Sequence, residues 1–138
     1  MVHERRWLVL FTRYPVHWFM RPFVSRKDYT HVALLSPIGN SQWIHFEWGV
    51  DGVHISPVGQ EKAGRLFAAS TEVVQYDQRE RAEPSPLNSI LPNTCITLAR
   101  QVMGLPGRWA FWRDGWALRC ELLERGGEIV IPARTRRQ

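Results

Sequence analysis

Cys95 is the residue of this 138-residue chain whose type and position most directly suggest chemistry. Pro92 ends the preceding segment, because the residue before a proline is disfavoured in a helix. Asn93 or Thr94 can then cap a new helix, and apolar residues recur at helical spacing until Gly104, where the helix is expected to end. The first turn of a helix favours a negative charge, and hence a thiolate at Cys95. The alternative interpretation is a small buried cysteine in an amphipathic helix.

A cysteine nucleophile needs a base, and His31 is the best placed of the five histidines. It lies in the apolar segment 29–36, which is rich in strand formers and predicts a β-strand. An imidazole in such a strand is costly to bury unless it is paired. His31 is therefore the predicted general base for Cys95.

The predicted third member of the site is His45. It lies in the next predicted strand, 42–48, which follows a turn at 37–41 and forms a hairpin with the strand of His31. Alternation places His45 and Glu47 on one face of this strand, with Phe46 on the other. If His31 and His45 point to the same face, His45 can orient the base as in a catalytic triad. Glu47 is the reserve candidate for that role.

The remaining elements predict the fold that must position these side chains. Strands come first and helices later, which indicates an α+β domain with an antiparallel sheet of four to six strands and the cysteine-bearing helix packed on it. Residues 1–138 are expected to form a single domain. Residues 60–69 fit either a short helix or an irregular crossover. Further strands are predicted at 7–12, 53–57, 71–76 and 128–132, a second helix at 112–124, loops at 13–28 and 77–88, and a basic tail at 133–138.

Composition excludes several classes of protein. With 44% hydrophobic and 22% charged residues the chain is globular and not disordered. Its two cysteines, Cys95 and Cys120, give no disulfide framework, and we expect both to be free thiols, with Cys120 in a packing role. Arginines interrupt the N-terminal apolar runs, so neither a signal peptide nor a transmembrane segment is predicted.

No cofactor, metal or nucleic acid is indicated by the sequence. The formal net charge of +5 is compatible with binding nucleic acid, but no known nucleic-acid-binding motif accompanies it. A zinc site built from Cys95, His31 and His45 has suitable ligand types but lacks a close ligand pair. There is no phosphate-binding glycine loop and no serine elbow.

Two short patterns resemble a known family. The segment Thr30–Leu35, the Gly39-Asn40 turn and Trp43–His45 are similar to the histidine-bearing hairpin of the NlpC/P60 papain-like superfamily. In standard members the cysteine helix precedes this hairpin, whereas here it follows, at Asn93–Ile96. That order resembles the circularly permuted branch, which includes lecithin:retinol acyltransferase-like enzymes and small bacterial and phage proteins. The resemblance covers residues 29–48 and 92–105.

The resemblance implies a permuted papain-like fold with a cysteine–histidine–histidine triad. The backbone N–H of the nucleophile would form part of the oxyanion hole. The implied catalytic residues are Cys95, His31 and His45, and the residues assigned to binding are Glu47, Asn93 and Thr94.

The predicted function is that of a cysteine-dependent hydrolase or acyl transferase acting on an amide or ester in a peptide, peptidoglycan or a lipid. The expected location is the cytoplasm of a bacterial host or a phage particle. The alternative is a non-enzymatic structural or interaction protein on the same scaffold, for instance a phage virion component. Its seven tryptophans and many arginines would then contact an assembly partner.

Overall fold

The computed structural model describes residues 5–13, 29–49, 52–78, 95–105 and 115–132. Within this part of the chain the fold is α+β, with six strands in one antiparallel sheet and three helices, which confirms the predicted class. The spatial order of the strands is β4-β3-β2-β1-β5-β6. The elements are β1 (Arg5–Thr12), β2 (His31–Gly39), β3 (Gln42–Gly49), β4 (Gly52–Gly59), α1 (Gln60–Ala69), β5 (Glu72–Gln78), α3 (Cys95–Val102), α4 (Gly115–Glu124) and β6 (Glu128–Ile131).

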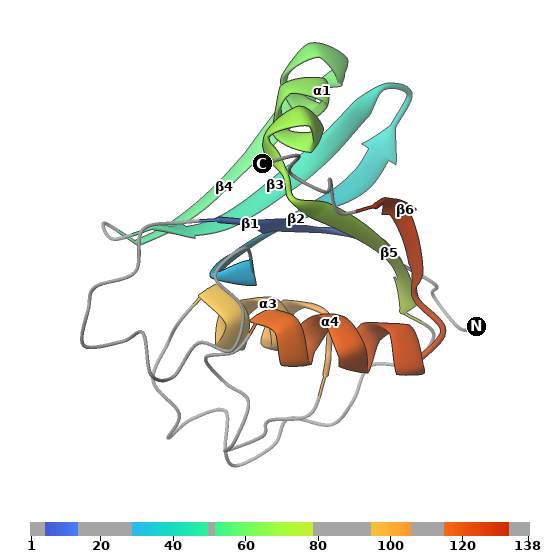
Figure 1. Ribbon diagram of the computed structural model, residues 1–138. Coiled ribbons are helices and arrows are strands. Elements are labelled where there is room, and N and C mark those ends of the chain that lie inside the picture. Colours follow the sequence, from blue (N-terminus) through green and yellow to red (C-terminus); the bar gives the residue numbers. More distant parts are fainter. Residues whose placement is uncertain (1–4, 14–28, 50–51, 79–94, 106–114, 133–138) are drawn as a thin grey trace, which may run out of the picture.

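Helices cover both faces of the sheet (Figure 1), with α3 and α4 on one face and α1 on the other. The central strand β1 is apolar on both sides, because Val9 and Phe11 pack toward α3 and α4 whereas Leu10 packs toward α1. Burial on both faces explains why this strand reads as an unbroken apolar run in the sequence. The cysteine-bearing helix α3 packs on β2 and β3, as predicted.

The predicted hairpin between β2 and β3 is confirmed, but its turn is shorter than the predicted 37–41. Both strands extend to Gly39 and Gln42, and Ser41 adopts a positive φ of 59° between them. Pro37 therefore lies within β2, paired with Trp43. The proline is tolerated because the described pairing of β1 with β2 stops at Leu35, beyond which β2 is an edge on that side.

The structure also settles the segment 60–69, for which the sequence left two alternatives. It is the helix α1, which buries Ala63 against the sheet and ends at Ser70. Ser70 closes the helix by donating its hydroxyl to the carbonyl oxygen of Leu66 at 2.7 Å. The predicted loop 77–88 begins later than expected, since Asp77 and Gln78 complete β5 and pair with β1. The predicted loop 13–28 beyond Arg13, the rest of 77–88 and the tail 133–138 lie outside the described residues.

Two buried ion pairs fix α4 against its neighbours and so hold the helical layer in place. Arg100 of α3 donates two hydrogen bonds to Glu121 of α4, one of them 3.2 Å long from Nη2 to Oε1, and both side chains are buried. Arg119 of α4 donates in the same bidentate way to the buried Glu72 of β5. Bidentate pairing satisfies both carboxylate oxygens, which a buried carboxylate requires. The helix that carries Cys95 is thus tied through α4 to the sheet.

Candidate active site

His31 is the first residue of β2, at one end of the sheet, and its imidazole is largely buried, with 13% of the side chain exposed. Its Nε2 atom lies 2.8 Å from Oε1 of Glu47 on the neighbouring strand β3. This is hydrogen-bond distance, and the carboxylate accepts from the ring N–H. Glu47, which we assigned to binding, therefore stands in the position predicted for His45.

The register of the hairpin explains why Glu47 takes this position. Ala33 pairs with Glu47, and Leu35 pairs with His45. Because side chains alternate along a strand, His31 shares a face with both Glu47 and His45. Along the strands it is two residues closer to Glu47. His45 is a further two residues along β3, about 7 Å more at ~3.4 Å per residue. The glutamate is thus the side chain of this face that reaches the base.

Cys95 is the first residue of α3, and Figure 1 shows this end of the helix directly beneath the start of β2. The cysteine is half-buried and packs against the core between the sheet and α3, close enough to His31 to raise the pKa of that ring. No acidic side chain lies in the first turn of α3. No carboxylate in this turn therefore offsets the positive end of the helix dipole at Cys95.

The surroundings of His31 favour its protonated form. Burial of the ring acts to lower its pKa, but hydrogen bonding and negative charge from Cys95 and Glu47 outweigh burial, and the pKa of His31 is raised above the usual histidine value. A histidine flanked in this way can stabilise a thiolate on one side while a carboxylate stabilises the imidazolium on the other.

His45 lies behind Glu47. It is buried, with 6% exposure, and its Nε2 atom is 3.4 Å from Oε2 of Glu47 but makes no hydrogen bond of acceptable geometry. Burial lowers the pKa of His45; Glu47 acts against this lowering, while Lys62, His31 and His54 add to it. His45 is therefore neutral near pH 7.

The sequence already held a signal for Glu47. The predicted turn 37–41 joins Ser36 to Gln42. Counting five residues back from Ser36 and five forward from Gln42 brings His31 opposite Glu47. The observed register displaces that pairing by one position on each strand but keeps Glu47 nearer than His45. The prediction that His45 orients the base depends on the hairpin face that it shares with His31, and it does not use this count. The predicted binding residues Asn93 and Thr94 lie outside the described residues.

Other candidate features do not join this site. Cys120 is half-buried in α4 and is not part of the site. His54 is exposed on β4 but borders the site, since it pairs with Glu47 and adds to the lowering of the His45 pKa. Among the described residues no group of three or more histidine, cysteine, aspartate and glutamate side chains could hold a metal ion. None of the helices in the described ranges is long and apolar enough to cross a membrane.

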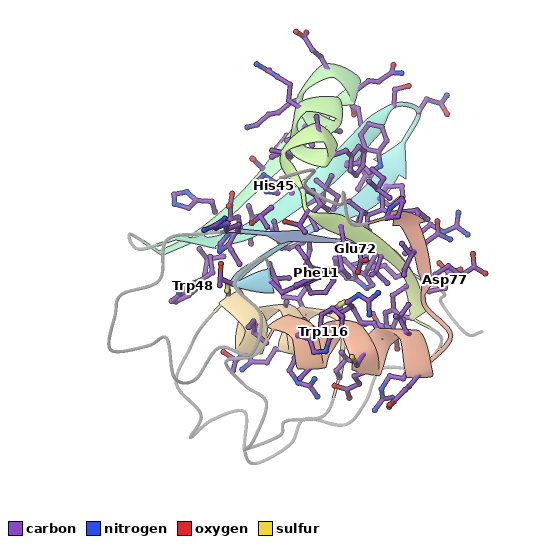
Figure 2. All side chains as sticks on the ribbon, viewed as in Figure 1. Phe11, His45, Trp48, Glu72, Asp77 and Trp116 are labelled. Carbon is purple, nitrogen blue, oxygen red and sulfur yellow. The ribbon has the colours of Figure 1, made fainter. Side chains whose placement is uncertain are left out.

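The tryptophans of the described segments are not a surface feature. Trp7 is buried in the core, and the other three, Trp43, Trp48 and Trp116, are half-buried. Figure 2 shows Trp48 on the α3 side of the sheet and His45 on the α1 side, in agreement with the predicted alternation along β3. The exposed large apolar residues of this part of the chain are instead aliphatic.

Comparison of the chain with protein-family models, with curated proteins and with solved structures gives no match. The functional argument therefore depends on the geometry of Cys95, His31 and Glu47.

Proposed function

We propose that this protein is a cysteine-dependent acyl-transfer enzyme, a hydrolase or acyl transferase acting on an amide or ester. The observation that carries the proposal is a single imidazole, His31, engaged by a thiol from the start of a helix and by a carboxylate from the adjacent strand. Nucleophile, base and orienting group in this relation are the recurring arrangement of cysteine acyl-transfer enzymes. The active side chains are Cys95, His31 and Glu47.

In the first half-reaction His31 takes the proton of Cys95. Because Nε2 of His31 is bonded to Glu47, Nδ1 is the nitrogen left to exchange this proton. The Cys95 thiolate attacks the substrate carbonyl carbon, and the carbonyl electron pair moves to oxygen. The free backbone N–H at the start of α3 is suited to hold that oxyanion. Return of the electron pair expels the leaving amine or alkoxide, which takes the proton from His31.

In the second half-reaction the thioester on Cys95 is resolved. His31, now neutral, accepts a proton from water or from an acceptor alcohol or amine, whose oxygen or nitrogen attacks the thioester carbonyl. The C–S bond breaks, the acyl group leaves as acid, ester or amide, and the proton on His31 returns to the thiolate. Glu47 keeps its hydrogen bond throughout and stabilises the imidazolium formed in each step.

The order of these elements supports a circularly permuted papain-like fold. The histidine-bearing hairpin β2–β3 precedes the cysteine-bearing helix α3 in the chain, and the sheet that contains this hairpin lies between α3 and α1. A peptide, a peptidoglycan crosslink and a lipid ester all present the carbonyl that this chemistry requires. The resemblance to the permuted NlpC/P60 papain-like superfamily, noted in the sequence, also leads us to propose a bacterial or phage source.

The proposal is tested by trapping the acyl-enzyme. The protein is incubated with p-nitrophenyl acetate at neutral pH, and the acetylated cysteine is located by peptide mass spectrometry. We expect acetyl on Cys95, a loss of its formation rate of about a hundredfold in His31→Ala, and no change in Cys120→Ser. Equal labelling of Cys95 and Cys120, or labelling of Cys95 that ignores His31, would overturn the enzymatic function.

A second candidate function, an interaction protein, is favoured by the outer strand β4. Val53 and Ile55 on this strand are 43% and 61% exposed, and their common face continues that of Phe46 and Trp48 on β3. An exposed apolar strip on an edge strand is typical of a surface that meets a partner. This alternative predicts that no acyl-enzyme forms and that self-association or binding to a partner depends on Ile55.

A further inference from the structure

A pocket of about 440 Å³ lies at the end of the β2–β3 hairpin that is distant from Cys95. Ile38 lines this pocket and is seven residues along β2 from His31, about 23 Å at ~3.3 Å per residue. In Figure 2 Asp77, another lining residue, lies at the opposite end of the sheet from Trp48. The volume is in the range of small-molecule sites, about 300–1,000 Å³. The pocket is therefore separate from the proposed active site.

One wall of the pocket is apolar and open to solvent. Ile38, Ile44 and Phe46 line it. Strand alternation places Ile44 on the face of Phe46, which packs toward α3 and α4, and Ile38 lies at the register shift between Pro37 and Gly39. Ile38 is 50% exposed. An apolar ligand laid on this wall would remove from water a surface that the described residues leave uncovered, which is favourable.

Arginines bring positive charge to the pocket. Arg5 and Arg6 of β1 line it, and Asp77 is the only other charged lining residue within the described ranges. Strand alternation places Arg5 on the face of Trp7, and Arg6 and Asp77 on the opposite face of the sheet. Arg6 is committed to Asp77, with Nε 3.0 Å from Oδ1 and Nη2 3.4 Å from Oδ2. The Arg5 guanidinium lies 5.6 Å from the centre of the Trp7 ring, which orients the cation without neutralising its charge. Arg5 is thus the side chain best suited to hold an anion here.

We propose that this pocket binds a small amphiphilic anion, a molecule with a short apolar body and a single carboxylate or phosphate group. The apolar body lies on Ile38, Ile44 and Phe46, and the anionic group pairs with Arg5. A carboxylate and a phosphate share the chemistry that a guanidinium recognises. This binding requires no part of the acyl-transfer machinery, so it stands or fails independently of Cys95.

The first experiment uses 8-anilinonaphthalene-1-sulfonate, an anionic apolar dye that fluoresces in apolar surroundings, titrated into the full chain. The bound dye is then competed with octanoate, octyl phosphate, 1-octanol and acetate. We expect saturable dye binding and displacement by octanoate or octyl phosphate, the stronger of the two identifying the anionic group. 1-Octanol and acetate should compete poorly, because each lacks one half of the ligand. Equal competition by 1-octanol and octanoate, or no saturable binding, would overturn the proposal.

Variants locate the dye within the pocket. Arg5→Gln and Ile38→Ser should each weaken binding about threefold to fivefold. Ile129→Ser, which alters an equally exposed isoleucine on the distant strand β6, is the matched control and should leave the affinity unchanged. Cys95→Ser should likewise have no effect. A loss in Ile129→Ser equal to that in Ile38→Ser, or an unchanged affinity in Arg5→Gln, would place the dye elsewhere and refute the assignment.

Discussion

The Nε2 atom of His31 lies 2.8 Å from Oε1 of Glu47, and the other oxygen of the same carboxylate lies 3.4 Å from Nε2 of His45. One carboxylate therefore stands between two histidines of opposite character. Burial acts to lower the pKa of His31, but Cys95 and Glu47 outweigh burial and raise it. At His45 burial prevails, and the pKa is lowered. Of the two histidines, His31 is therefore the one suited to exchange protons near neutral pH. His45 lies next to the carboxylate without a hydrogen bond to it.

Removing the charge of Glu47 should impair the site more than removing His45. In Glu47→Gln the amide cannot stabilise an imidazolium, so we expect Cys95 acetylation at pH 7 to slow by about tenfold or more. The His31 ring should also lose its proton at lower pH than in the wild-type protein, as followed by NMR titration. His45→Gln should give a smaller loss of rate, because the Nε2 atom of His45 makes no hydrogen bond to Glu47. An equal or larger loss in His45→Gln would return His45 to the orienting position.

The lowered pKa of His45 gives the folded protein a specific sensitivity to acid. The unfolded chain protonates His45 as the pH falls through about 6.5, whereas the folded protein does not, so the free energy of unfolding decreases below that pH. The raised pKa of His31 acts in the opposite direction, since its contribution is present below the unfolded pKa and is lost as the pH rises through the folded pKa.

Urea unfolding of the wild type and His45→Gln at pH 8 and pH 5.5 isolates the contribution of His45. The wild type should lose more of its stability than the variant between the two pH values, because only the wild type carries the acid-sensitive imidazole. A stability difference between the two proteins that is the same at both pH values would contradict a lowered pKa for His45.

The buried pair of Arg100 and Glu121 should dominate the stability of the helical layer. In Glu121→Gln the Arg100 guanidinium, 3% exposed, loses its carboxylate partner, and we expect a loss of about 3–5 kcal/mol in the free energy of unfolding. Asp77→Asn breaks the exposed pair with Arg6 and is the matched control, with an expected loss below about 1 kcal/mol. Equal losses in urea unfolding would show that the buried pair does not join α3 to α4.

Gly115 lets α4 begin against the backbone next to the site. A Cβ added there would collide with the carbonyl oxygen of Tyr29, two residues before His31, so Gly115→Ala should destabilise the protein and slow Cys95 acetylation. Gly64→Ala on α1 is the control: no atom lies within 4 Å of its added Cβ, and alanine should stabilise this helix by about 0.5–1 kcal/mol. A neutral Gly115→Ala would show that α4 can shift without disturbing His31.

Most of the sheet could be predicted because its strands alternate or are continuously apolar. Phe46 and His45 fall on opposite faces of β3 as the sequence indicates, and Val9 and Leu10 explain why β1 has no polar face. The sequence leaves the segment 60–69 undecided, because three apolar residues at helical spacing among charged and small ones are a short signal. These residues, which pack on the sheet, are Ala63, Leu66 and Phe67. Tertiary packing against the sheet decides that it is a helix.

The sequence predicts the side chains of the site, but it ranks His45 ahead of Glu47 as the residue that orients His31. Placing Cys95 at a helix start and His31 in a strand depends on local signals, Pro92 and the apolar run, which act within a few residues. Which side chain orients His31 depends on the hairpin register, and Pro37 seemed to end β2 although it lies inside it. The exact register depends on the two-residue turn, for which the predicted turn 37–41 is too long, although a count from that predicted turn already favours Glu47 over His45.

The central claim is that His31 activates Cys95. The most direct measurement is the rate of Cys95 alkylation by iodoacetamide between pH 5 and 9 in a Cys120→Ser background, with and without His31→Ala. We predict faster alkylation of Cys95 in the protein with His31 than in His31→Ala, because a protonated His31, whose pKa is raised, stabilises the negative charge on the reacting sulfur. Identical pH profiles for the two proteins would contradict the account.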